Sequence, residues 1–166
     1  MHNETNFDEM RFVRQMRYHR LGVSGQRKLS QAHAAIVGCG ALGSATALSL
    51  TRAGIGKLTI IDRDVPEWSN LPRQFLFSEK DVCDGLPKAI IAESRLKEID
   101  KNVQVIPHVT HLSNHNISDL LSSVDVIVDG NTDFAAIALE KRRAIERSPD
   151  FRRQRTGFHS HDCNPQ

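Results

Sequence analysis

The sequence predicts an α/β fold, in which a Rossmann-like parallel sheet carries helices on both faces. Short apolar stretches alternate along the chain with longer segments that have helical spacing. The first apolar stretch, Ala34–Val37, leads directly into the glycine-rich turn 38–43. A strand that enters such a turn and is followed by a helix is typical of nucleotide-binding α/β domains. We expect four parallel strands in the order 3-2-1-4, with the first strand in the centre.

The amino-terminal segment precedes the sheet, and we expect it to form helix in two pieces over residues 8–31. The break falls at Gly22–Gly25, where two glycines lie close together. The first piece is basic and amphipathic, and Met10 and Val13 are expected on its apolar side. Residues 1–31 are therefore predicted to be a helical segment ahead of the nucleotide-binding domain.

The remaining elements alternate between helix and strand. Ala41–Ala53 is rich in small and apolar residues and ends before Gly54, as a helix does when glycine caps its carboxyl end. The stretch that holds Pro66 and Pro72 is expected to be irregular. The other elements are expected, in chain order, as a strand over 58–61, a helix over 88–99, a strand within 103–109, a helix over 117–121 and a strand over 124–128.

The carboxy-terminal part differs from the rest of the chain. We expect the Rossmann-like domain to span 32–134 and a helix to follow over 135–147. Residues 148–166 are rich in arginine, and their large apolar side chains are Phe151 and Phe158. So few apolar groups cannot offset the cost of ordering the backbone, about 1–2 kcal/mol per residue. This segment is therefore predicted to be a basic, disordered tail.

Composition argues against several classes of protein. The 166-residue chain has a net charge of +2, so bulk electrostatics do not indicate a nucleic-acid-binding protein. No apolar run approaches the ~18 residues of a membrane span, and the acidic amino terminus does not resemble a signal peptide. The three cysteines form no CxxC pair, so neither a disulfide framework nor a zinc site is expected. These features favour a cytoplasmic protein without a membrane partner.

The glycine-rich turn has the chemistry of a phosphate site. Gly38, Gly40 and Gly43 permit a tight turn, close approach of phosphate to the backbone and close packing of the following helix. Unpaired N–H groups and the positive end of the helix dipole then face the phosphate. Cys39 is expected to fill a small slot in the turn rather than to act as a nucleophile. Asp62 follows Gly43 by 19 positions, close to the spacing of an acid that binds ribose.

Two cations downstream of the turn favour a nucleoside triphosphate. Arg73 offers a planar fork for phosphate, and Lys88 offers a point charge. Asp64 either holds a water or an ion near the phosphates or is a plain loop residue. A NAD(P)- or FAD-binding Rossmann module is the alternative, because the turn and Asp62 would serve it equally well. That alternative leaves the two cations without a role.

Acidic residues follow the last expected strand. The carboxyl ends of the strands in an open parallel sheet form the ligand crevice, and Asp129, Thr132 and Asp133 lie there. Their oxygen atoms are of the kind that Mg²⁺ prefers. A loose histidine cluster after the third strand is expected to face solvent rather than to bind a metal: His108, His111 and His115.

Five motifs occur in a fixed order along the chain, over about 120 residues from Arg11 to Gly130. They are Arg11-Phe12-Val13-Arg14-Gln15, the glycine turn, Ser69-Asn70-Leu71-Pro72-Arg73-Gln74, Gly85-Leu86-Pro87-Lys88-Ala89 and Val124-Asp125-Val126-Ile127-Val128-Asp129-Gly130. Together they resemble the ThiF/MoeB/HesA family, the prokaryotic relatives of ubiquitin-activating enzymes. The third and fourth motifs in combination are far more specific than the glycine turn. We expect the resemblance to end after Phe134.

The resemblance implies an ATP-dependent adenylyltransferase. Such an enzyme joins AMP to the C-terminal glycine of a ubiquitin-like sulfur-carrier protein ending in Gly-Gly, and it releases pyrophosphate. The glycine turn would hold the nucleotide, Asp62 would bind the ribose, and Arg14 would enter the partner subunit's site as an arginine finger in a homodimer. The resemblance implies phosphate contacts for Asn70, Arg73, Gln74 and Lys88.

The chain departs from the family pattern near its carboxyl end. A gap-free match puts Thr132 at the position of the acid that binds Mg²⁺ in the family, and a shift of one residue puts Asp133 there. The second half of the family's domain, with the CxxC zinc pairs that many members carry, is not found. We therefore expect Asp133 as the metal ligand, no zinc, and a truncated form of weak or no activity.

Overall fold

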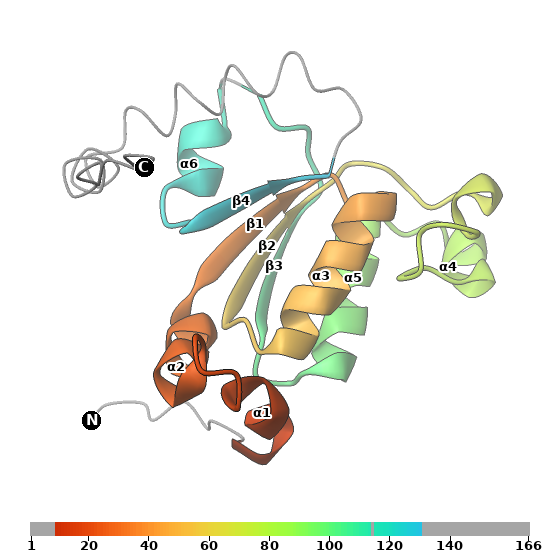
Figure 1. Ribbon diagram of the computed structural model, residues 1–166. Helices are drawn as coiled ribbons and strands as arrows, with labels where there is room; N and C mark the ends of the chain where they lie inside the picture. Colours follow the sequence, from red (N-terminus) through yellow and green to blue (C-terminus); the bar gives the residue numbers. More distant parts are fainter. Residues whose placement is uncertain (1–8, 114, 131–166) are drawn as a thin grey trace, which may run out of the picture.

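The computed structural model describes residues 9–113 and 115–130, and these residues confirm the predicted fold class. All strand pairs are parallel, and the sheet has the order β3-β2-β1-β4 that we predicted (Figure 1). The strands are β1 (His33–Val37), β2 (Lys57–Ile61), β3 (Gln104–His108) and β4 (Val126–Asp129). In the centre of the sheet, Val37 lies opposite Ile61 on one side and Asp129 on the other.

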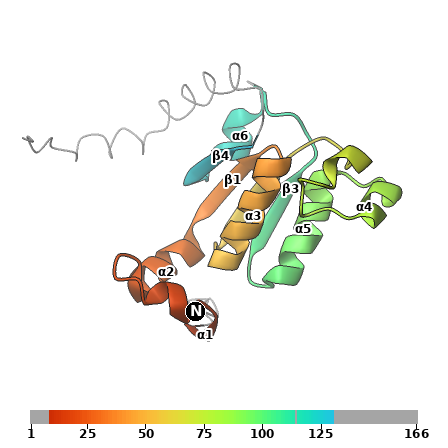
Figure 2. The ribbon, with the colours of Figure 1, turned by 45° about the vertical axis from the view of Figure 1, so that its right-hand side comes forward.

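Helices cover both faces of the sheet (Figures 1 and 2). α3 (Ala41–Ala53) and α5 (Lys88–Ile99) lie on one face, and α6 (Ile117–Leu121) lies on the other. Because strand side chains alternate, Ile36 packs into the core beneath α3 and α5, whereas Val37 packs with Ile117 of α6. Both strand residues are almost fully buried, as expected for a central parallel strand.

The amino-terminal helices pack at the end of the sheet where the strands begin. α1 (Glu9–Met16) and α2 (Gly22–Gln31) meet the carboxyl end of α3, which Gly54 caps with a φ of +88°. Gln15 Nε2 donates to the carbonyl oxygen of Ala53 at 2.7 Å, and Gln26 Nε2 donates to the same oxygen at 2.8 Å. Two amides therefore satisfy a carbonyl group that the helix end leaves without an intrahelical partner.

The predicted apolar side of α1 was wrong. Met10 is 81% exposed and Val13 is 38% exposed, whereas Phe12 is buried. A Cβ atom at Gly54 would lie 2.6 Å from the Phe12 ring, so this glycine makes room for the aromatic side chain. α1 contacts the end of α3 through the Phe12 ring and the polar side chain of Gln15. A prediction based on a stripe of apolar residues does not detect this combination.

The segment predicted to be irregular contains a 3₁₀ turn over Trp68–Asn70, and a short helix for which we had made no prediction, α4 (Glu79–Asp84), follows it. A capping box in which Ser78 and Asp81 exchange hydrogen bonds opens α4, and Gly85, with a φ of +67°, ends it. Arg95 of α5 contacts Asp81 at 3.3 Å and holds α4 in place. The Ser-x-x-Asp pattern followed by glycine was the available sequence signal.

Two predicted segments, the helix over 135–147 and the tail over 148–166, lie outside the described residues. The same holds for Thr132 and Asp133. Within residues 9–113 and 115–130, no helix has the length and apolar character needed to cross a bilayer.

His33 forms hydrogen bonds that connect the segment before β4 to β1 and β2. Its N–H donates to Asp125 Oδ2 at 2.8 Å, and its carbonyl oxygen accepts from the N–H of Asp125 at 2.8 Å. Its ring Nδ1 lies 2.7 Å from the carbonyl oxygen of Ser123, and Nε2 lies 2.8 Å from Thr59 Oγ1. Since a carbonyl oxygen only accepts, neutral His33 carries its proton on Nδ1. Burial lowers the pKa of His33, the hydrogen bond to the Ser123 carbonyl opposes this, and the charges of Lys57 and Asp125 make smaller contributions of opposite sign.

We expect the chain to lose stability as the pH falls below about 6.5, the ordinary histidine pKa. Because the pKa of His33 is lowered in the folded state, the unfolded chain takes up this proton at the higher pH. The stabilisation that neutral His33 provides is therefore fully present above about pH 6.5, and it is lost as the pH falls toward the lowered pKa of the folded state. Urea unfolding between about pH 7.5 and 5.5 should give a shallower pH dependence for His33→Gln. Equal slopes for the two proteins would contradict this.

Candidate nucleotide-binding site

The glycine turn lies at the carboxyl end of β1, between that strand and α3. Gly38 has a φ of +86°, a conformation that favours glycine. A Cβ atom at Gly43 would lie only 1.9 Å from the Gly38 carbonyl oxygen, so the first turn of α3 packs directly on the loop. A Cβ atom at Gly130, just after β4, would lie 2.4 Å from the same oxygen. Gly130 is the last residue of the fifth motif, but the sequence did not indicate that it packs against the glycine turn.

Gly40 is in a different environment from the other glycines of the turn. A Cβ atom there would meet Gln74 Nε2 at 3.9 Å and the Gly130 carbonyl oxygen at 4.0 Å, which are ordinary contacts. Packing of the described residues therefore does not require glycine at this position. Gly40 itself is the residue before the first turn of α3, where N–H groups without intrahelical partners favour an anion.

Asp62 follows β2 and connects the glycine turn to the loop beyond the strand. Its Oδ2 accepts from the N–H of Cys39 at 2.6 Å, and its Oδ1 accepts from the N–H of Asp64 at 2.7 Å. The Asp62 side chain is buried, and its charge-assisted hydrogen bond to Cys39 is shielded from water, whereas the one to Asp64 is only partly so. Each carboxylate oxygen keeps a second lone pair, and either can still accept from a ribose hydroxyl.

Lys88 begins α5 and is buried beside this loop. Its backbone N–H donates to the carbonyl oxygen of Asp64 at 2.8 Å. Its Nζ lies 3.7 Å from Asp64 Oδ2, and its side chain is only 7% exposed. Among the described residues, Asp64 is the one ion-pair partner found for Lys88. A positive charge on a side chain this buried, at the strand ends, is well suited to bind a phosphate group.

The other predicted phosphate contacts lie on the segment 69–74. Asn70 is buried, and its Oδ1 accepts from the N–H of Glu67 at 3.1 Å, so it shapes the local 3₁₀ turn. Arg73 is exposed, and its Nη1 donates to the carbonyl oxygen of Ser69 at 2.6 Å. Gln74 is buried, and its Oε1 has no hydrogen-bond partner among the described residues. Of the three side chains, Gln74 is the one shown to adjoin the glycine turn.

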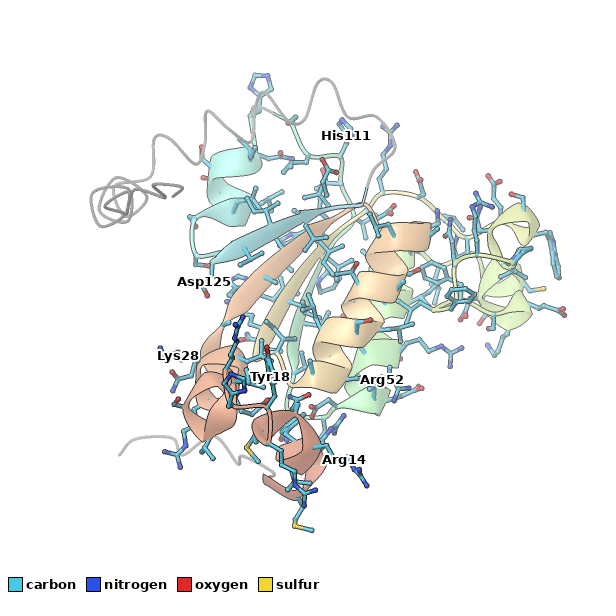
Figure 3. All side chains as sticks on the ribbon, viewed as in Figure 1. Arg14, Tyr18, Lys28, Arg52, His111 and Asp125 are labelled. Atoms are coloured by element: carbon cyan, nitrogen blue, oxygen red, sulfur yellow. The ribbon has the colours of Figure 1, made fainter. Side chains whose placement is uncertain are left out.

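Arg14 is not brought to this site within the chain. Figure 3 shows it on α1 at the end of the molecule opposite His111, which lies near the carboxyl ends of the strands. Its motif neighbours face the protein: Arg11 pairs with Asp100 at 3.5 Å and Phe12 is buried. Arg14 itself is exposed. Arg14 therefore does not contact the candidate site of its own chain.

Cys39 does not offer a reactive thiol, and the described residues contain no preformed metal cluster. Cys39 is buried, as predicted, and burial together with the charge of Asp62 raises its pKa to about 12. The thiol therefore stays protonated near neutral pH and is a poor nucleophile. No group of three or more His, Cys, Asp or Glu side chains in this part of the chain could hold a metal ion, and His111 and His115 are exposed.

The fold and the glycine turn together define a nucleotide-binding α/β domain. Residues 12–160 match the ThiF family, so the chain belongs to this family. The match continues past Phe134, where we expected the resemblance to end.

The similar proteins include adenylyltransferases. The chain is 42% identical over 141 residues to a sulfur carrier protein ThiS adenylyltransferase of Bacillus subtilis, covering 85% of the chain and 42% of that relative. It is 40% identical over 124 residues to the adenylyltransferase and sulfurtransferase MOCS3 of Danio rerio, covering 75% of the chain and 27% of that relative. The chain thus spans less than half the length of either protein.

A solved structure of similar fold contains a nucleotide. It is E. coli tRNA N6-threonylcarbamoyladenosine dehydratase in complex with ATP, which has a TM-score of 0.72 and 28% sequence identity to the chain. The similarity covers 81% of the chain and 56% of that structure.

Substitutions at Gly43 and Gly40 should separate the contribution of the glycine turn to stability from its contribution to nucleotide binding. Gly43→Ala would force a Cβ atom against the Gly38 carbonyl oxygen, and we expect it to cost about 2 kcal/mol or more of unfolding free energy. Gly40→Ala should cost about 1 kcal/mol or less, as a helix-capping change, and should mainly impair nucleotide binding. Urea unfolding and ATP titration measure the two effects. Equal losses of stability would contradict the assignment.

Proposed function

We propose that this domain binds ATP and activates the C-terminal glycine of a ubiquitin-like sulfur-carrier protein as an acyl-adenylate. The carboxylate attacks the α-phosphorus, the α–β phosphoanhydride bond breaks, and pyrophosphate leaves. Catalysis rests on positioning and on neutralising the charge of the phosphates rather than on a protein nucleophile. The high pKa of Cys39 agrees with this.

The observation that carries the proposal is the burial of Lys88 close to the glycine turn. Gly40 places its backbone at the amino end of α3, where a phosphate group can bind, and Lys88 provides a buried positive charge that is joined to the turn through the hydrogen bonds of Asp62 and Asp64. The names of the relatives support the carrier protein as substrate, and the solved structure supports ATP. A NAD(P)- or FAD-binding module would leave Lys88 without a role.

Asp62 would accept from the ribose hydroxyls, and Asn70, Arg73 and Gln74 would complete the phosphate site. Arg73 is held by one backbone carbonyl oxygen and is otherwise exposed, so its guanidinium group can turn toward a bound phosphate. Gly38 and Gly43 would keep the turn closed around the nucleotide. The second copy of a homodimer would supply Arg14, which agrees with its exposure far from the site of its own chain.

Mg²⁺ would enter with the nucleotide. The described residues offer no cluster of three or more ligands, which suits an ion that takes most of its ligands from phosphate and water. Asp133 is our proposed protein ligand. The Mg²⁺ ion, when bound, would neutralise negative charge on the leaving pyrophosphate.

Exchange of labelled pyrophosphate into ATP tests the proposed reaction. Exchange should require both ATP and a carrier protein ending in Gly-Gly, because the back reaction needs an acyl-adenylate. A carrier without its last glycine is the matched control. ATP binding without carrier-dependent exchange would reduce the proposal to a nucleotide-binding domain that performs no adenylation.

We expect Arg73→Ala or Lys88→Ala to weaken ATP binding at least about tenfold, since charge-assisted hydrogen bonds to phosphate are lost. Adenosine has no phosphate, so its affinity should be nearly unchanged. Isothermal titration of each variant with ATP–Mg²⁺, adenosine and NAD⁺ measures this. Equal losses for ATP and adenosine would exclude a phosphate role, and tighter binding of NAD⁺ than of ATP would favour the dinucleotide alternative.

A further inference from the structure

Lys88 and Asp64 form an ion pair in which one side chain is buried and the other is exposed. The Lys88 side chain is 7% exposed and that of Asp64 is 61% exposed, although their charged atoms lie 3.7 Å apart. Burial makes an unpaired ammonium group costly, so Lys88 needs an anion at all times. Asp64 can exchange this contact for water at little cost, because exposed ion pairs contribute little. Arg63 offers it a second contact, with Nε at 4.0 Å from Asp64 Oδ1.

The backbone of Asp64 is fixed on both sides. Its N–H donates to Asp62 Oδ1 at 2.7 Å, and its carbonyl oxygen accepts from the N–H of Lys88 at 2.8 Å. The carboxylate can therefore rotate away from Lys88, but it cannot leave its neighbourhood. Any phosphate group that binds Lys88 meets a tethered negative charge at the same place.

We propose that Asp64 competes with the phosphates of the nucleotide for Lys88 and so lowers the affinity of the site for ATP and pyrophosphate. This inference rests on the proposed function. In the nucleotide-free protein, Asp64 serves as the counter-ion of Lys88. A phosphate group must break this ion pair before it can bind Lys88, and Asp64 can re-form the pair, which lowers the net gain from binding and favours release of pyrophosphate after the reaction. Asp64 thus acts through Lys88 as a residue that tunes affinity.

Asp64→Asn should bind ATP and pyrophosphate about two- to fivefold more tightly, the range expected for removing one exposed charge interaction. Adenosine binding should not change. Glu98→Gln is a matched control, because Glu98 is 64% exposed, pairs with Arg95 at 3.7 Å and lies ten residues along α5 from Lys88. The full chain is titrated with each ligand, with and without Mg²⁺, and thermal unfolding checks that each variant is folded. Asp64→Ser carries the same expectation if Asp64→Asn is unstable.

In a Lys88→Met background, the gain from Asp64→Asn should disappear. A gain that persists there, or unchanged affinity of Asp64→Asn in an otherwise native chain, would overturn the competition. Weaker binding only with Mg²⁺ would also overturn it, because Asp64 would then act as a metal ligand. Failure of the native chain to bind ATP or pyrophosphate would instead overturn the proposed function.

Discussion

The site depends on one buried carboxylate, that of Asp62. It accepts hydrogen bonds from the N–H groups of Cys39 and Asp64, and so joins the turn after β1 to the loop after β2. Lys88 attaches to the same loop through the Asp64 carbonyl oxygen. Without this carboxylate, the buried N–H of Cys39 and the N–H of Asp64 would lose their partner, and the turn would no longer be linked to the lysine. Asp62 therefore links the architecture of the sheet to the electrostatics of the site.

Much of the fold could be predicted because local patterns determine it. Apolar strands at regular intervals, a glycine turn and a capping Gly54 are sufficient for the sheet order and for α3. The buried side of α1 could not be predicted, because Phe12 and Gln15 contact a helix end that is distant in sequence. Such contacts are properties of the folded chain, and periodicity along one helix does not contain them.

The site could be predicted in part, for a similar reason. The spacing from the turn identified Asp62 as the ribose-binding acid, and the motifs identified Lys88 as a phosphate contact. Neither indicated that Asp64 bonds to Asp62 through its N–H and pairs with Lys88 through its carboxylate. The close approach of Gly130 to Gly38 also depends on β4 pairing with β1, a contact between distant segments. Sequence thus indicated which residue types are present, and tertiary packing determines which of them share an ion pair or a hydrogen bond.

The central claim is that the turn and Lys88 hold the phosphates of ATP. A crystal structure of the full chain with ATP and Mg²⁺ tests it most directly. We predict phosphate oxygens within hydrogen-bonding distance of backbone N–H groups near Gly40 and of Lys88 Nζ, with Asp64 turned away from the lysine. A nucleotide bound elsewhere, or one whose phosphates lie away from the turn while Lys88 still contacts Asp64, would contradict the claim.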